Sequence, residues 1–567
     1  MEKRVILAML LSLVVLVTYQ ILIGPPPQQP PTTAQDTAAN PATQGDKAGP
    51  SKPATPAPSA PASPAPAAAP VVSAPPVALV VGDTAARDIV VDADAFVATF
   101  TSAGATLKSW RLKHYLHEGE PLELVAPDAP PGLYPAMFTI QTDDPAQTKV
   151  LASALYRPST ERLTLGSSAG TLRFQYQDAS GLASQKTFLF QPNGHPFEVT
   201  VEASVDAGGA PKPVAISGGV GIGVFDPAGG SSTTPPRVVQ FRDQSVERIA
   251  ATSLQPPTYE GAIHFAGIED HYFVIAAVPR GAPSRVDYAA LQGTGRTLIG
   301  FTVRPKMEGS PSSTVTVPFY LGPKEIDRLV EVDPPMMNAI DFGMFGWLVR
   351  PLLRSLKWIN QFVHNYGWSI ILLTVVINVL IFPLRHKSMV SMRKMQTLQP
   401  QVKAIQDRYK SLKFTDPDRQ KMNSEMMALY KQHGVNPASG CVPMLLTLPI
   451  LFAFYAMLAV AIELRGAPFG GWIHDLAAKD PLYITPIIMG GTMFWQQRMM
   501  PSTADPVQQR VFLFLPLIFT FMFLTMPSGL VLYWTASNLL AIGQQTLTNR
   551  LIAAPAKPAR LPRKAQP

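Results

Sequence analysis

The stretch from Thr374 to Leu384, TVVINVLIFPL, lies inside an uncharged apolar run at about 368–384. A run of this length is close to the roughly 20 apolar residues with which a helix crosses a bilayer. It nevertheless contains Asn378 and, four residues earlier, Thr374, and a helix places residues at this spacing on one face. Polar groups in lipid normally face a partner helix or a wet cavity. The stretch therefore predicts a membrane helix with one polar face.

Similar apolar runs indicate further membrane helices. Four of them follow toward the C-terminus, at about 442–462, 482–495, 511–526 and 529–547. At the N-terminus about 19 uncharged residues follow Lys3 and Arg4. A signal peptide is the alternative for that segment, but Gly24 and three prolines stand where a small-residue cleavage site is needed. An uncleaved anchor fits better, which brings the prediction to six spans.

The region between the anchor and the C-terminal runs has two parts of different composition. Residues 25–76 contain 16 prolines among Ala, Ser, Thr and Gln, a composition typical of an extended, disordered linker. From residue 79 to 335 short runs alternate with period two, and Asn193-Gly194 separates two of them as a hairpin turn does. About 250 residues of strands without interleaved helices predict a large all-β sandwich.

Basic residues predict the orientation of the spans. The connection 385–433 holds eleven Lys and Arg, whereas the connection 463–481 holds two. Cytoplasmic loops carry the excess of basic residues, so the first connection and both chain ends are expected in the cytoplasm. The β-region, whose net charge is −7 against +15 for the rest of the chain, is then expected on the opposite side.

Two segments flanking the second span show helical periodicity. Residues 340–366 space large apolar side chains between Arg350, Arg354 and Lys357, which predicts an amphipathic helix at the membrane interface. Residues 385–436 predict a basic helical hairpin, which is either a solvated surface or a platform for acidic partners such as ribosomal RNA or lipid headgroups. The cations that would carry such docking are Arg393, Lys394, Lys403, Arg408, Lys410, Arg419 and Lys421.

The membrane runs contain few groups that could perform chemistry. The five C-terminal runs hold no Asp, Glu, Lys or Arg, which disfavours an ion-coupled carrier. The sequence contains no phosphate-binding loop of the P-loop type, which disfavours ATP-driven work. The polar residues of the last span, among them Tyr533 and Ser537, fit either ordinary hydrogen bonding between helices or a water-accessible groove.

The order of short motifs resembles the YidC membrane-protein insertases of Gram-negative bacteria. The matching segments are FPL (382–384), SEMMALYKQHGVNPASGCVPMLLTLPILFAFY (424–455), ELRGAPFGGWIHDLAAKDPLY (463–483), MFWQQRMMPSTADPVQQ (493–509) and MPSGLVLYWTASNLLAIGQQ (526–545). The resemblance is strong after residue 340 and weaker in the β-region. It implies a membrane protein with six transmembrane helices, a periplasmic β-sandwich of sugar-mutarotase type and a cytoplasmic helical hairpin.

The resemblance also implies a domain organisation. The expected parts are a signal-anchor helix (1–24), a disordered linker (25–78), the periplasmic domain (79–335), an interfacial helix (340–366), a five-helix insertase core (367–550) that includes the hairpin (385–436), and a basic tail (551–567).

The function implied by the resemblance is the insertion and folding of newly made inner-membrane proteins, alone or with the Sec translocon. Such proteins work through a hydrophilic groove, without a cofactor, small-molecule substrate or enzymatic reaction. The expected partners are nascent chains, membrane lipids and the ribosome, which the basic tail would contact through Lys557, Arg560, Arg563 and Lys564.

The expected groove residues are Thr374, Asn378, Tyr533, Trp534 and Ser537. Thr374 and the pair Tyr533-Trp534 match groove positions of the family. Asn378 departs from the pattern, because relatives commonly carry a cation there that is thought to attract acidic substrate tails. The nearest cation in this chain is Arg385, seven residues later. A membrane-anchored periplasmic binding protein and a channel or carrier are the alternative functions.

Overall fold

The computed structural model describes residues 79–551, apart from residues 118, 127–128, 131, 209–212, 223–234, 256, 294–296, 307–312, 410–417, 435–441 and 500–505. The predicted anchor (1–24), linker (25–78) and basic tail, with Lys557, Arg560, Arg563 and Lys564, lie outside the described residues, as does Lys410.

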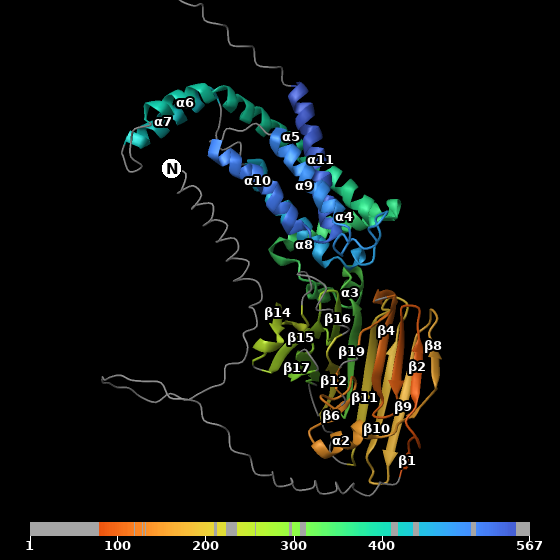
Figure 1. Ribbon diagram of the computed structural model, residues 1–567. Helices are drawn as coiled ribbons and strands as arrows, with labels where there is room; N and C mark the ends of the chain where they lie inside the picture. The colour runs from red at the N-terminus through yellow and green to blue at the C-terminus, as the bar shows by residue number, and fades with distance from the viewer. Residues whose placement is uncertain are drawn as a thin grey trace, which may run out of the picture. The chain divides into compact units, whose positions relative to one another are not determined.

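Two β-sheets build the N-terminal domain (Figure 1). The larger sheet has the order β1 (Leu79–Val81), β9 (Gly170–Asp178), β10 (Ala183–Phe190), β11 (Glu198–Asp206), β19 (Thr314–Pro323), β16 (Phe273–Ala277), β15 (Thr258–Glu269), β17 (Pro283–Gln292), β18 (Thr297–Pro305), β12 (Val214–Val220) and β6 (Ile140–Thr142). Off this path, β7 (Arg157–Pro158) pairs with β9, and β13 (Arg237–Arg242) pairs with β15 and with β14 (Ser245–Ala250). The smaller sheet has the order β5 (Glu120–Glu123), β4 (Thr106–His117), β3 (Phe96–Thr101), β2 (Asp88–Asp92) and β8 (Arg162–Thr164).

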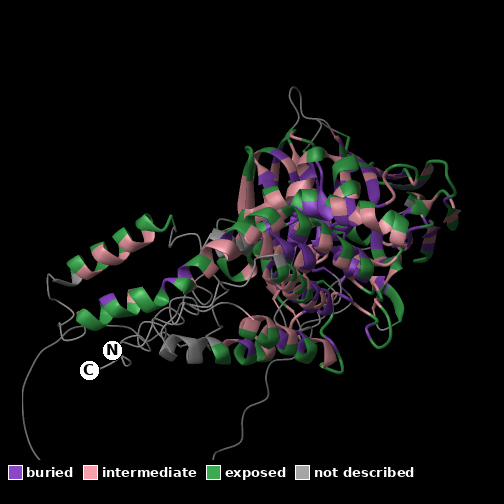
Figure 2. Ribbon diagram, turned by 90° about the horizontal axis from the view of Figure 1, so that it is seen from above, coloured by how far each residue is buried: buried purple, intermediate pink, exposed green. Residues whose placement is uncertain are grey.

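Alternating side chains form the core of this domain, as the period-two pattern predicts. Phe96 and Trp110 stack with ring centroids 3.9 Å apart, and both are almost fully buried. Buried residues gather inside the β-domain (Figure 2). The predicted hairpin at Asn193-Gly194 is confirmed, because β10 and β11 pair in antiparallel register on either side of it.

One helix interrupts the strands, so the prediction of strands without helices is wrong at this point. Helix α2 (Pro145–Ser153) begins where Asp144 accepts a hydrogen bond from the Ala146 N–H at 2.9 Å. Proline at the first helical position is favourable because its missing N–H needs no partner there. A cap and a first-turn proline thus start a short helix within a β-rich segment.

A buried lysine lies within the sandwich. Lys186 on β10 is 1% exposed, and its ammonium donates to the carbonyls of Gly104, Ala105 and Phe138 at 2.6, 3.2 and 2.7 Å. Burial lowers the pKa of Lys186 to about 7. The three carbonyls match the three N–H donors of the charged ammonium. The contact that these hydrogen bonds make between the two sheets therefore depends on the protonation state of Lys186.

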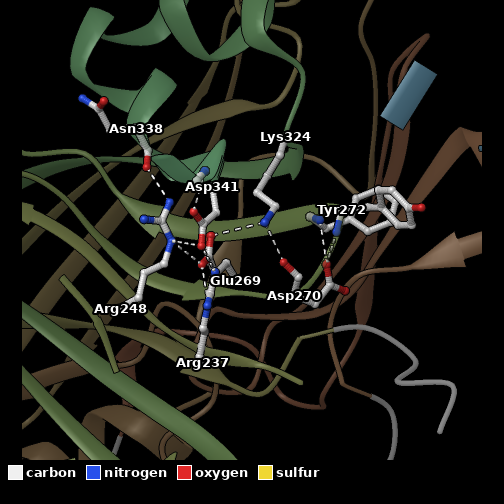
Figure 3. A network of polar contacts seen from close by, with 10 residues as sticks. Arg237, Arg248, Glu269, Asp270, Tyr272, Lys324, Asn338 and Asp341 are labelled. Atoms are coloured by element: carbon white, nitrogen blue, oxygen red, sulfur yellow. Dashed lines mark hydrogen bonds and ion pairs between the residues drawn. The ribbon is translucent and has the colours of Figure 1, made fainter. Parts of the chain in front are cut away.

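A charged network fixes the point at which the chain leaves the β-domain (Figure 3). Glu269 is fully buried, and its carboxylate accepts from Arg237 at 2.7 Å, Arg248 at 3.0 Å and Lys324 at 3.3 Å. Arg248 also donates to the carbonyl of Asn338 at 2.7 Å. The network therefore holds η2 (Pro334–Ala339), which lies between α3 (Ile326–Val332) and η3 (Gly343–Phe345) in the chain, against β13 and β15, and Arg248 of β14 bonds to it directly.

The predicted interfacial helix is α4 (Gly346–Val363). Its buried residues, Val349, Leu352, Leu353 and Leu356, form one stripe, while Arg350 and Arg354 are exposed with Trp347, Trp358 and Phe362. Lys357 differs from the two arginines, since it is half-buried and ion-paired. Its ammonium contacts Asp327, Glu325 at 3.2 Å and Glu463 at 3.3 Å, so this cation joins the helix to the β-domain.

Five longer helices follow α4: α5 (Tyr366–Thr397), α8 (Val442–Val460), α9 (Ile484–Met499), α10 (Pro506–Phe523) and α11 (Ser528–Leu551). Figure 1 shows α5, α9 and α11 side by side, with α11 packed against both of the others. Of the described residues, only those of α5 form a helix that is long and apolar enough to cross a membrane. Helix α5 continues through Pro383 and through residue 385, where the sequence places the start of the hairpin.

Replacement of the buried lysine tests its link to pH. Unfolded lysine has a pKa near 10.4, so between about pH 7 and pH 10 the unfolded chain binds more protons than the folded chain. The contribution of Lys186 to the free energy of unfolding therefore rises with pH in this window, by about 1.4 kcal/mol per unit at most. We expect Lys186→Met to remove this rise. The measurement is denaturant unfolding at pH 7.5 and 9.5, followed by the signal of the β-sheets.

The matched control is Lys108→Met, which removes an exposed lysine of the neighbouring sheet and should keep the wild-type dependence on pH. An unchanged pH dependence in Lys186→Met would contradict the assignment.

Candidate functional site

The polar face of α5 is formed by Thr374, Asn378 and Arg385, of which Thr374 and Asn378 are buried. The Thr374 hydroxyl donates to the carbonyl of Ile370 at 2.7 Å, and the Asn378 amide donates to the carbonyl of Thr374 at 2.8 Å. Both donors are thus satisfied within their own helix. The remaining amide oxygen of Asn378 accepts a hydrogen bond of 2.8 Å from the Nη1 atom of Arg385.

Helix geometry explains why Arg385 reaches Asn378. Seven residues are about two turns, which returns the chain to nearly the same face about 10 Å farther along the axis. Helical side chains lean toward the N-terminus, so the long Arg385 side chain runs back along this face. The guanidinium is half-buried, and the described residues offer it neither a carboxylate partner nor a second hydrogen bond.

Helix α11 contributes aromatic and hydroxyl groups. Tyr533 is buried and stacks on Phe454 of α8 with ring centroids 4.1 Å apart. Its phenol lies close enough to Arg385 for the two groups to interact electrostatically. Ser537, one turn farther along, is half-buried and has no hydrogen-bond partner among the described residues. Trp534 instead packs on Phe519 and Phe523 of α10, so the two aromatic residues face different helices.

Hydrogen bonds join α11 to its neighbours over its C-terminal half. On the α5 side, Gln544 donates to the Asn378 carbonyl at 3.1 Å, and Thr548 lies 3.2 Å from the ring of His386. On the α9 side, Asn538 donates to Thr492 at 3.2 Å. Ordinary hydrogen bonding between helices therefore accounts for these polar residues of α11. We use the name α5–α11 polar row for Thr374, Asn378, Arg385, Tyr533, Ser537 and Gln544.

The segment 465–483 connects the N-terminal ends of α5 and α11. Asn365, the cap of α5, donates to the carbonyls of Pro468 and Phe469 at 3.2 and 3.1 Å. At the other end, the N–H groups of Ser528 and Gly529 donate to the carbonyls of Ala478 and Leu476 at 2.7 and 2.9 Å. We call this segment the floor, because it lies across the N-terminal ends of both helices.

Asp480 organises the floor. Its side chain is 1% exposed and accepts hydrogen bonds from Trp472 at 3.0 Å, the Leu482 N–H at 2.9 Å, and the N–H and hydroxyl of Thr485, both at 2.7 Å. Burial alone would raise the pKa of Asp480, but the hydrogen bonds, led by those from Thr485, lower it. A charged carboxylate therefore holds the floor to the start of α9.

The predicted docking cations have different environments. Helices α6 (Gln399–Arg408) and α7 (Asp418–Gln432) pack on each other through the hydrogen bond of 2.8 Å from Tyr409 to Glu425, and most of their residues are exposed or half-buried (Figure 2). The cations Lys394, Lys403, Arg408 and Lys421 are exposed, and the backbone of Arg419 lies in α7.

Arg393 is the exception among these cations. It lies on α5, and its guanidinium donates to Asn549 of α11, so it belongs to the contact between helices.

Sequence reasoning did not count Arg385 or Asp480 among the site residues. The signal for Arg385 was its distance of seven residues from Asn378, which places both on one helical face. Asp480 lies in the motif HDLAAKDP, but its four hydrogen bonds depend on the tertiary course of the floor.

Comparison with known proteins places this chain in a family. A family model described as the 60Kd inner membrane protein matches residues 358–555, and one described as the YidC periplasmic domain matches residues 88–355. A solved structure titled "Active YidC insertase crystal structure with the first transmembrane domain resolved" aligns at 18% identity over 83% of this chain and 94% of that chain, with a TM-score of 0.35.

Relatives match over nearly the full chain. A protein named membrane protein insertase YidC from Geotalea daltonii is 34% identical over 98% of this chain and 100% of its own length. The protein of the same name from Syntrophus aciditrophicus is 35% identical over 97% of this chain and 100% of its own length. The chain therefore belongs to the YidC family of membrane protein insertases, and it is an inner-membrane protein with a periplasmic domain.

Proposed function

We propose that this insertase passes the hydrophilic flank of a nascent membrane protein along the α5–α11 polar row, while the apolar segment leaves sideways into lipid. The observation that carries the proposal is a row of polar groups, including the half-buried Arg385 and Ser537, along the contact between α5 and α11. No nucleotide hydrolysis is needed, because burial of the apolar segment in lipid drives the step.

The polar row would lower the free-energy cost of moving the hydrophilic flank across the membrane, because it would keep that flank hydrated. A peptide group or hydroxyl transferred to hydrocarbon without a partner costs several kcal/mol. Water and side chains along the row would replace part of that dry path. The floor would keep the path closed on the periplasmic side, which fits its hydrogen bonds to the N-terminal ends of α5 and α11.

The proposed topology has six spans: the anchor at 1–24 and helices α5, α8, α9, α10 and α11. Both chain ends and the pair α6–α7 would lie in the cytoplasm, and the β-domain in the periplasm. The excess of Lys and Arg in 385–433 supports this orientation. The exposed Trp347, Trp358 and Phe362 of α4 support a helix at the membrane interface.

The proposed partners are the ribosome, the Sec translocon, membrane lipids and nascent inner-membrane proteins. Exposed cations on α6 and α7, with Lys557, Arg560, Arg563 and Lys564 of the tail, would contact ribosomal RNA or anionic headgroups. The protein would act as a chaperone and insertase rather than an enzyme, with no cofactor. The groove residues Thr374, Asn378, Tyr533, Trp534 and Ser537 remain predictions.

Depletion of the protein tests the function directly. We expect small inner-membrane proteins with short translocated flanks to remain protease-accessible on the cytoplasmic side in depleted cells, because their flanks no longer have a hydrated path. Membrane integration is followed by pulse labelling and protease protection. Normal integration after depletion would overturn the proposal, and an anchored binding protein would then fit better.

A pair of matched hydroxyl deletions tests the polar row. Ser537→Val removes a half-buried hydroxyl that is free among the described residues, whereas Thr535→Val removes a hydroxyl of the same helix that lies outside the polar row and is already bound by the Val531 carbonyl. We expect Ser537→Val to reduce insertion of a substrate with a hydrophilic flank about threefold, while Thr535→Val stays near wild type. Equal losses in both variants would argue against hydration of the row.

Replacement of Asp480 tests the floor. Asp480→Ala leaves the Thr485 and Leu482 N–H groups without their acceptor, and hydrogen bonds to a charged group contribute about 1.5–3 kcal/mol each. We expect faster cleavage of the floor by protease added to the periplasmic side and a lower unfolding midpoint. The control is Asp475→Ala, which removes a single local bond to Ala477 in the same segment. Identical protease resistance in wild type and Asp480→Ala would refute the role.

A further inference from the structure

We propose that the outward face of α4, formed by Trp347, Arg350, Arg354, Trp358 and Phe362, binds anionic phospholipid, and that its two arginines select the negatively charged headgroup. The partner is the bilayer itself rather than another protein. Such binding requires α4 to lie at headgroup depth, so the inference rests on the proposed topology and goes beyond it by naming the lipid.

The first support is the composition of this face. At 3.6 residues per turn its five residues fall within roughly a third of the helix circumference. The aromatic members are 71%, 60% and 69% exposed in chain order, and both arginines are exposed as well. The opposite face carries the buried stripe of α4 and packs against α5 and α8. Two guanidinium groups among three exposed aromatic rings suit the depth at which headgroups meet hydrocarbon.

The second support is the absence of a counter-charge. Neither Arg350 nor Arg354 forms an ion pair within the described part of the chain. The acidic residue nearest to them in the sequence, Asp341, already pairs with Arg237 at 3.1 Å. Lys357, the third cation of α4, contacts three carboxylates instead. The positive charge of the two arginines is therefore available to an anion from outside the chain.

The spacing of the two arginines suits a phosphate. They are one turn apart, which places their Cβ atoms about 6 Å from each other. The guanidinium of Arg350 lies 5.6 Å from the centre of the Phe342 ring, and Phe342 is buried, so a fixed aromatic ring supports this cation. A phosphodiester offers two unesterified oxygens, and guanidinium groups bind such oxygens through paired N–H donors. Both arginines can thus share one headgroup phosphate.

The third support is the position of α4 in the chain. Helix α4 ends at Val363, and two residues later begins α5, which is long and apolar enough to cross a membrane. The turn is tight, because His364 has a left-handed backbone (φ 54°) and Asn365 caps α5 by accepting from the Trp368 N–H at 3.1 Å. Trp368 is also exposed. A helix held this close to the start of a span meets lipid headgroups before it meets a soluble acidic protein.

The test measures which lipid surrounds α4. Full-length protein is reconstituted in vesicles of equimolar phosphatidylglycerol and phosphatidylcholine. In two parallel samples either the anionic or the zwitterionic lipid carries brominated acyl chains, which quench nearby tryptophan fluorescence. The ratio of the two quenching efficiencies reports local enrichment of the anionic lipid. The part of the quenching that Trp347→Phe/Trp358→Phe abolishes is the signal of α4.

We expect a ratio of about three for the α4 signal of the wild-type protein, because each arginine near the surface attracts anionic lipid. Arg350→Gln/Arg354→Gln should lower this ratio to about one. Arg350→Lys/Arg354→Lys should retain part of the enrichment, because it keeps both charges but loses the paired donors.

The matched control is Arg162→Gln/Arg173→Gln. It removes two exposed cations of β8 and β9 that likewise have no ion pair among the described residues. The ratio should stay at the wild-type value, because these residues are not part of α4.

Three results would overturn the inference. Equal quenching by both lipids in the wild-type protein would leave α4 at the interface without selection of a headgroup, and an acidic protein surface would then fit the arginines better. A ratio that stays high in Arg350→Gln/Arg354→Gln would assign the selection to other residues. An α4 signal that neither lipid quenches would overturn the interfacial position of α4 as well. The measurement uses no nascent chain, so it stands apart from the test of insertion.

Discussion

The helical part of this protein depends on one constraint, which is that polar groups buried between packed helices must find partners inside the protein. The contact between α5 and α11 meets it by pairing Gln544 with Asn378, Thr548 with His386, and Asn549 with Arg393. These bonds set the rotation of both helices about their axes. Once the rotation is set, Tyr533 and Ser537 of α11 share one side of that helix, and the polar row follows.

The protein treats buried charge in two ways. In the β-domain, Glu269 is surrounded by two arginines and a lysine, and at the junction Lys357 is surrounded by three carboxylates. Both clusters join segments that are distant in sequence, which suits a structural role. Arg385 has only a neutral amide as its described partner. Lys186 of the β-domain likewise has only backbone carbonyls as described hydrogen-bond partners, so a buried charge with neutral partners occurs in both parts of the protein.

Local patterns in the sequence predicted a large part of this arrangement. The alternation of apolar residues indicated the β-domain, the Asn193-Gly194 pair indicated its hairpin, and the apolar periodicity at 340–366 indicated α4. Helix α2 was missed because its signal is a single cap and a proline within β-rich surroundings. The Lys357 cluster and the hydrogen bonds of Asp480 could not be predicted, because their partners lie on elements whose approach depends on the whole fold.

The residues of the candidate site were easier to predict from the sequence than the contacts between them. Thr374 and Asn378 were placed on one face from their spacing, and the structure puts them there. That Tyr533 and Trp534 face different helices depends on the packing of α8 and α10, which adjacent positions in a sequence do not reveal. The contact from Arg385 to Asn378 required the side-chain direction as well as the spacing.

The unbroken course of α5 has a mechanical consequence. Its 32 residues make a rod of about 48 Å, longer than the roughly 30 Å of a hydrocarbon core, and Leu398 alone separates it from α6. No loop absorbs displacement between the pair α6–α7 and the polar row. The weakest point on this course is Pro383, which removes one hydrogen bond of the helix, so a push on that pair would reach Asn378 through a bend at this residue.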